Sequence, residues 1–259
     1  TRMLQARAQT MTSVIDAGGG FQSYPDDYAV IKRLHAQGQL TLRIAYNLFP
    51  QRKGEELSDI KGWMSSLEPG QGDDRYRHNG AGEMLVFSAA DFEDFREPRP
   101  ELPAAMEEEL EISRALDVFE RVARDQPFEG LPWFFDHAET ISERNIDRVA
   151  ALGGGIAVQH RMAYQGEDFA QRYGLEAAGA VPPVRRMLAA GVPVGAGTDA
   201  TRVASYNPWT CLAWLVSGQT LGGARLMPTG NRLTREEALR LWTAGSAWFS
   251  SEAGRKGRI

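Results

Sequence analysis

Cysteine, histidine and long apolar segments are scarce in this chain of 259 residues. The single cysteine, Cys211, excludes an intramolecular disulfide and any zinc site built from cysteines. The longest apolar runs, such as residues 191–197, are far shorter than the roughly 20 residues that a membrane-spanning helix needs. Any metal site must combine carboxylates with the four histidines, which are His35, His78, His137 and His160.

An excess of basic charge is also absent. The 29 basic and 34 acidic side chains give a net charge of -5, and no dense block of lysine and arginine stands out, which argues against a nucleic-acid-binding surface. A composition of 42% apolar and 24% charged residues is typical of a globular protein that buries a sizeable core. The chain begins without Met and without a charged-then-apolar signal segment, and it closes without a finishing element. We therefore expect it to be part of a longer protein, and its compartment stays open.

Short apolar runs alternate with amphipathic segments along the chain. The alternation predicts six strands, at residues 14–16, 42–46, 83–87, 133–137, 156–159 and 192–196. Helices are predicted at residues 26–37, 55–67 and 104–124, after the N-cap Ser142, between Pro182 and Gly191, and from the capping box at Thr234 through Trp242. Strands separated by single helices indicate βαβ units and a parallel sheet.

The polar residues near the ends of these strands favour one of two architectures. Six strands fit an open doubly wound sheet or an incomplete eight-stranded barrel. A barrel collects its chemistry at the carboxyl ends of its strands. Polar residues are found at these ends, namely Asp16, Asn47, His137, His160 and Asp199. The pattern favours the barrel.

Two local signals could carry chemistry. In residues 195–200 an apolar strand delivers Asp199 into a glycine-rich turn, which suits a metal-binding carboxylate that also accepts a proton; the alternative is that Asp199 caps the next helix. In residues 134–139, His137 leaves a buried strand where a neutral imidazole could bind a metal; the alternative is a satisfied core histidine.

Taken together, these motifs resemble the amidohydrolase superfamily, specifically amidohydrolase family 3, the N-substituted formamide deformylase-like metal-dependent hydrolases. The resemblance covers nearly the whole chain and depends on the order and spacing of the motifs, since no single motif is diagnostic. The motifs lie at residues 12–20, 42–46, 79–83, 136–139, 157–162, 197–200 and 239–243.

The resemblance implies a distorted (β/α)8 barrel over residues 1–259, with one or two divalent metals, zinc above all, at its rim. In the family's pattern, His137 is similar to the metal-binding histidine of strand 6. Asp199 is similar to the aspartate of strand 8 that binds metal and moves the proton from water to the leaving amine. Glu83 falls near a bridging ligand of strand 4, with an exposed glutamate at the start of a strand as the alternative. His160 is expected to face substrate, and Arg202 could hold a substrate carboxylate or be a surface arginine.

The chain departs from the family's pattern in two places. No two histidines are two residues apart, so the His-x-His motif of strand 1 is absent, and the histidine of strand 5 is absent too. We therefore expect the regions of strands 1 and 5 to be missing, with residues lacking between Glu111 and Ile112. A hydrolytic zinc usually needs three protein ligands. Without these histidines, a chain that binds no metal is compatible with the sequence.

The leading hypothesis is a metal-dependent hydrolase that cleaves a non-peptide C–N bond in a small amide, cyclic amide or N-acyl compound. The alternative is an inactive barrel with a binding or regulatory role. A phosphate-binding turn at residues 16–20 ranks last, because it lacks the glycine spacing of nucleotide-binding motifs. The expected partner is a small molecule, without nucleic acid or a membrane span, and a homo-oligomer is compatible with the sequence.

Overall fold

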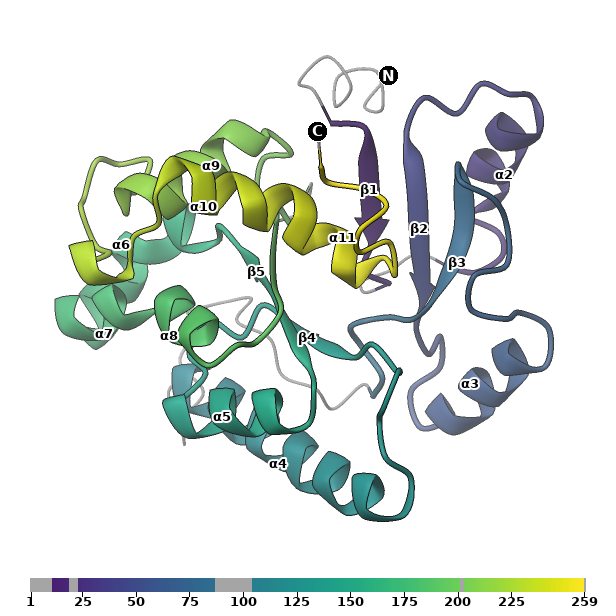
Figure 1. Cartoon of the computed structure of the whole chain (residues 1–259), viewed down its shortest axis with the longest axis horizontal. Helices are drawn as coiled ribbons and strands as arrows, with labels where there is room; N and C mark the ends of the chain where they lie inside the picture. Colours follow the sequence, from purple (N-terminus) through teal and green to yellow (C-terminus); the bar gives the residue numbers. More distant parts are fainter. Residues whose placement is uncertain (1–10, 19–22, 87–103, 201–202, 259) are drawn as a thin grey trace. The chain divides into compact units, whose positions relative to one another are not determined.

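The computed structural model describes residues 11–18, 23–86, 104–200 and 203–258. The chain divides into two compact units, residues 1–89 and 90–259. Each unit has a parallel three-stranded sheet, with the strand orders β1-β2-β3 and β4-β5-β6 (Figure 1). The predicted α/β class with parallel strands is therefore confirmed.

The first unit alternates strands and helices. Its elements are β1 Ser13–Asp16, α2 Ala29–Ala36, β2 Arg43–Leu48, α3 Glu56–Met64 and β3 Tyr76–Ala81. A stack of tyrosines fills its core, where the rings of Tyr46 and Tyr76 lie 4.7 Å apart. Burial raises the pKa of Tyr46 to about 12, so its hydroxyl stays protonated.

The third predicted strand is wrong. The strand next to β2 is Tyr76–Ala81, whereas residues 83–86 follow it without strand structure, and residue 87 lies outside the described residues. Tyr76 and His78, at alternate positions, are both buried, while Leu85 and Val86 are exposed. The apolar run at residues 83–87 has the composition of a strand. The strand forms instead in the more polar segment before it, where every second side chain, first a tyrosine and then a histidine, is buried.

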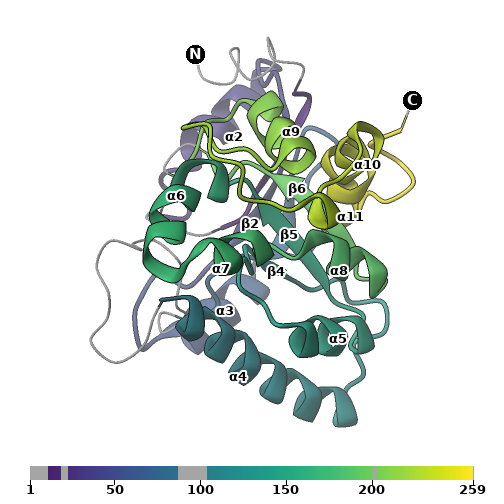
Figure 2. The same cartoon turned by 90° about the vertical axis from the view of Figure 1, so that its left-hand side faces the viewer.

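The second unit begins with a long helix and carries the second sheet. Its strands are β4 Phe134–Asp136, β5 Gly155–Gln159 and β6 Val194–Gly197. Its helices are α4 Ala104–Asp125, α5 Glu143–Ala151, α6 Met162–Tyr173, α7 Leu175–Ala180, α8 Val184–Ala189, α9 Pro208–Ser217, the 3-10 turn Thr229–Asn231, α10 Arg235–Arg240, the π-turn Leu241–Gly245 and α11 Ser246–Phe249. Figure 2 shows α4 and α5 running next to each other, in agreement with their contacts.

Two predicted helix starts are confirmed, and one helix end differs. The Ser142 side chain accepts a hydrogen bond from the backbone of Asn145, and Thr234 forms a capping box with Glu237. The last helix was expected to continue through Trp242, but α10 ends at Arg240 and a π-turn follows. The Ser246 hydroxyl bonds to the carbonyl oxygens of both Leu241 and Ala196, which ties this turn to β6.

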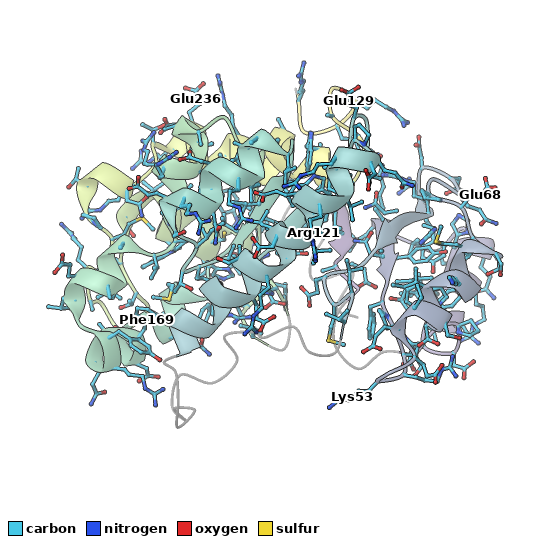
Figure 3. The ribbon with its side chains drawn as sticks, turned by 90° about the horizontal axis from the view of Figure 1, so that it is seen from below. Lys53, Glu68, Arg121, Glu129, Phe169 and Glu236 are labelled. Carbon is cyan, nitrogen blue, oxygen red and sulfur yellow. The ribbon has the colours of Figure 1, made fainter. Side chains whose placement is uncertain are left out.

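Helix α4 passes through Glu111 and Ile112 without a break. Ile112 and Leu116 are buried in the core of the second unit, and Arg121 is exposed on the outer surface (Figure 3). The expectation that residues are lacking between Glu111 and Ile112 stays a prediction. The helix forms here because the apolar positions 112 and 116 are four residues apart on one face.

The predicted barrel is not seen as a closed structure. Over the residues that the structure describes, six strands form two separate three-stranded sheets and no closed barrel. A groove of about 780 Å³ opens at the amino ends of β4 and β5, beside Phe128, Leu131 and Trp248. None of the described helices is long and apolar enough to cross a membrane.

Candidate functional site

The carboxyl ends of β4, β5 and β6 bring three polar side chains together. His137 follows β4, Arg161 follows β5 and Asp199 follows β6. The three strands are neighbours in one parallel sheet, so their carboxyl ends share an edge. The backbone N–H of His137 donates to the carbonyl of Ala157 and to the side-chain oxygen of Gln159, both on β5, which fixes where His137 leaves its strand.

The backbone at this edge is left-handed. Four described residues other than glycine have a positive φ, and three of them lie here: His137 at 68°, Ala138 at 55° and Asp199 at 50°. Such conformations cost free energy for residues with a Cβ atom, and they are concentrated at functional sites. The turns therefore set the directions of the His137 and Asp199 side chains, and the backbone at these residues is strained.

His137 and Asp199 face each other. The Nε2 atom of His137 lies 3.9 Å from Oδ2 of Asp199, and the two side chains are 10% and 28% exposed. One metal ion can bridge such a separation, since zinc lies about 2.0–2.2 Å from each nitrogen or oxygen ligand. Asp199 is not the N-cap of α9, the next helix in the part of the chain that the structure describes, because the side chain of Asn207 accepts the N-cap hydrogen bond from Trp209.

Two further charged groups surround His137 on its other side. The Arg161 side chain is 1% exposed, and its Nη2 lies 3.2 Å from Oδ2 of Asp199 and 3.5 Å from Nδ1 of His137. The Glu139 side chain, also 1% exposed, places Oε1 3.9 Å from the same Nδ1. The site is thus a cluster of one histidine, one arginine and two carboxylates, in which Asp199 is partly exposed and the other three side chains are 10% exposed or less.

The sequence argument did not assign a role to Arg161 or Glu139. It chose His160 at the end of β5, but Arg161, one residue further, is the side chain that reaches Asp199. Glu139 lies two residues after His137. Both residues could have been found by asking which charged side chains directly follow a buried strand end, since a buried charge needs a partner.

His160 lies in the interior. Its side chain is buried and packs against the ring of Tyr164 at 5.4 Å. Burial lowers the pKa of His160 to about 4, while the nearby backbone of Gly197 acts in the opposite direction, so the imidazole is neutral at pH 7. The predicted contact with substrate stays a prediction.

The two remaining predicted site residues are Glu83 and Arg202. Glu83 is exposed and follows the carboxyl end of β3 in the first unit, rather than beginning a strand. Its backbone N–H donates to the carbonyl of Ala17. Arg202 lies outside the described residues. The ligand role of Glu83 and the substrate role of Arg202 stay predictions.

The comparison with protein families decides the relationship of the chain. The profile of the Amidohydrolase family matches residues 1–259. The chain belongs to the amidohydrolase family. The resemblance drawn from the order of its motifs is thereby confirmed. A comparison with curated protein sequences found no match.

Several solved structures have a similar fold. An uncharacterized metal-dependent hydrolase from Pyrococcus horikoshii OT3 aligns with a TM-score of 0.72 and 18% identity over 99% of this chain and 55% of that chain. Its counterpart from Pyrococcus furiosus gives 0.70 and 17% over the same shares. A mutant of atrazine chlorohydrolase TrzN from Arthrobacter aurescens TC1, complexed with zinc and atraton, gives 0.55 and 18% over 98% of this chain and 60% of that chain. The chain thus spans somewhat more than half the length of these structures.

The donor atoms of the site fit a divalent cation in part. A neutral imidazole nitrogen and a carboxylate oxygen are ordinary zinc ligands, and His137 and Asp199 present one of each. Among the residues that the structure describes, no group of three histidine, cysteine, aspartate or glutamate side chains is placed to hold a metal ion. The described part of the site therefore offers two donors where a catalytic zinc takes three.

Proposed function

We propose that this amidohydrolase chain is part of a metal-dependent hydrolase that cleaves a C–N bond other than a peptide bond in a small amide, cyclic amide or N-acyl compound. The observation that carries the proposal is the pair His137 and Asp199, which face each other at adjoining strand ends on strained left-handed turns. The relatives of similar fold include metal-dependent hydrolases and a hydrolase crystallised with zinc, which supports a divalent metal as the cofactor. The proposed framework is a distorted (β/α)8 barrel formed over residues 1–259, of which this chain carries an incomplete set of strands.

The residues have separate tasks in this proposal. His137 and Asp199 would hold the cation, and the Asp199 carboxylate would accept a proton from water and pass it to the leaving amine. When bound, a divalent cation acidifies water and polarises the carbonyl of the substrate. Glu83 is a proposed third ligand, and His160 and Arg202 are proposed to bind substrate.

Metal content tests this proposal first. The chain is prepared with zinc, freed of excess metal and measured by elemental analysis, beside the variants His137→Ala and Asp199→Asn. Asparagine tolerates a left-handed backbone, so Asp199→Asn removes the carboxylate with little added strain. We expect about one equivalent of zinc in the native chain and a clear loss in both variants. His35→Ala is the matched control. His35 contacts Asp73 and is not a proposed metal ligand, so its replacement should leave the zinc content unchanged.

Hydrolysis of amide, cyclic amide and N-acyl compounds is then measured with the loaded protein. Asp199→Asn removes both a proposed metal ligand and the proposed proton acceptor, so it should lower kcat by about 10²-fold or more. A native chain that folds but retains no zinc, or an Asp199→Asn variant with native activity, would contradict the proposal.

One observation favours a second candidate function. The guanidinium of Arg161 lies beside Asp199 and supplies a positive charge within the site, and the described residues offer only two metal donors. An inactive barrel with a binding or regulatory role is therefore the second candidate. A folded protein without zinc and without activity on all three substrate classes is the result that this candidate predicts.

A further inference from the structure

The two ring nitrogens of His137 face different groups. Nε2 faces Asp199, at 3.9 Å from Oδ2. Nδ1 faces Arg161, at 3.5 Å from Nη2, and Glu139, at 3.9 Å from Oε1. A neutral imidazole carries one proton, so one nitrogen donates and the other accepts. The neighbours of Nδ1 therefore decide what Nε2 can do.

Arg161 favours one of the two tautomers. A guanidinium only donates hydrogen bonds and keeps its charge in proteins. When Arg161 donates to Nδ1, that nitrogen must accept, and the ring proton lies on Nε2, where it points towards Asp199. An imidazole nitrogen binds a metal through its lone pair, so Nε2 cannot bind a cation in this tautomer.

Glu139 favours the other tautomer. Its side chain is 1% exposed, and neither carboxylate oxygen forms a hydrogen bond in the part of the chain that the structure describes. A buried carboxylate without a hydrogen bond is costly. A proton on Nδ1 would give Glu139 its donor across the present 3.9 Å gap and leave the lone pair on Nε2 facing Asp199.

We infer that Arg161 and Glu139 compete for Nδ1 of His137 and thereby set which ring nitrogen carries the proton. Glu139 is a positioning residue that prepares Nε2 to bind a cation, and Arg161 favours the tautomer that cannot bind one, so that it weakens cation binding without abolishing it. Arg161 also places a positive charge 3.2 Å from Asp199, where it opposes a second cation. The consequence for metal binding rests on the proposed function, whereas the choice of tautomer does not.

The tautomer is measured without metal. Nitrogen-15 NMR of the imidazoles distinguishes a protonated Nδ1 from a protonated Nε2, and the signals of His137 are assigned with His137→Ala. We expect the native chain to carry the proton on Nε2. Arg161→Met, which keeps the bulk of the side chain, should move it to Nδ1, and Arg161→Lys should restore most of the native pattern. Adding Glu139→Gln to Arg161→Met should weaken the preference for Nδ1.

Zinc titration by calorimetry gives the second readout. Arg161→Met should bind zinc about tenfold more tightly than the native chain, and Glu139→Gln should bind about 10- to 100-fold more weakly, as is typical when the partner of a metal-binding histidine is removed. Arg186→Met is the matched control, since Arg186 pairs with Asp147 and Glu143 outside the cluster and should leave zinc affinity unchanged. Thermal unfolding confirms that each variant folds.

The outcomes separate the two proposals. Identical tautomers in the native chain and in folded Arg161→Met overturn the inference. Tautomers that shift as expected, with no zinc bound by any variant, support the competition for Nδ1 and overturn the proposed metal-binding role of His137. Zinc binding that is lost in His137→Ala but unchanged in both Arg161→Met and Glu139→Gln supports the proposed function and overturns the inference.

Discussion

At the scale of single residues, burial decides the charge of His160. The side chain is buried beside Tyr164, and burial lowers its pKa to about 4 from the ordinary 6.5. The unfolded chain therefore takes up a proton at a higher pH than the folded chain does. The stability that neutral His160 contributes is fully present above pH 6.5 and is lost as the pH falls towards 4.

This difference predicts a specific acid sensitivity. Between pH 7 and pH 4, the native chain should lose up to about 3 kcal/mol of unfolding free energy through His160. Glutamine does not titrate, so the unfolding free energy of His160→Gln should fall by about 3 kcal/mol less than that of the native chain over the same pH range. Urea unfolding at several pH values measures both proteins. His35→Gln, with a partly exposed imidazole, is the control, and an equal pH dependence in native chain and His160→Gln would contradict the argument.

At the scale of elements, two glycines in β6 differ in the space around them. A Cβ atom on Gly195 would lie 2.7 Å from the ring of Phe249 and 3.2 Å from the Cα of Ser246. Around Gly197, in the same strand, nothing lies within 4 Å of such an atom. Glycine at position 195 therefore lets the segment after the π-turn pack directly on the sheet, beneath the edge that carries Asp199.

Alanine substitutions test this packing. Gly195→Ala should lower the free energy of unfolding by about 1–3 kcal/mol, because a methyl group must displace buried atoms. Gly197→Ala is the matched control and should change it by less than about 0.5 kcal/mol. Chemical denaturation measures both. A Gly195→Ala variant as stable as Gly197→Ala would show that α11 is not packed on β6 as described.

At the scale of the whole molecule, the residues that the structure describes form two separate apolar cores. One lies in residues 28–76 and includes Leu48, and the other lies in residues 112–241 and includes Ile146. The two clusters share no residue. Each unit thus has a core of its own, which is the usual criterion for a unit that can unfold by itself.

Core truncations should consequently act within one unit. Ile146→Ala should cost about 2–5 kcal/mol and lower the protection of β5 amides from hydrogen exchange more than that of β2 amides. Leu48→Ala should do the reverse. Hydrogen exchange with mass spectrometry resolves the two sheets. Equal loss of protection in both sheets after either substitution would mean that the units unfold together.

The α/β class of the fold followed from the sequence alone, and so did the prediction that His137 and Asp199 lie at one edge of a sheet, where the structure brings them within 3.9 Å of each other. Local signals sufficed for the helix starts at Ser142 and Thr234, because caps are made by residues close in sequence. The rule that chemistry lies at the carboxyl ends of parallel strands selected His137 and Asp199. Order and spacing of motifs established the family, which the match over residues 1–259 confirms.

Tertiary structure alone decided the rest. The polar segment Tyr76–Ala81 pairs with β2, and the more apolar residues 83–86 do not. Whether a segment becomes a strand depends on its neighbouring strand and on which of its side chains become buried. The roles of Arg161 and Glu139 depend on distances to His137 across residues far apart in the chain or on opposite sides of a turn. Whether a charged residue is exposed or buried against an imidazole is set by packing, and no local pattern encodes it.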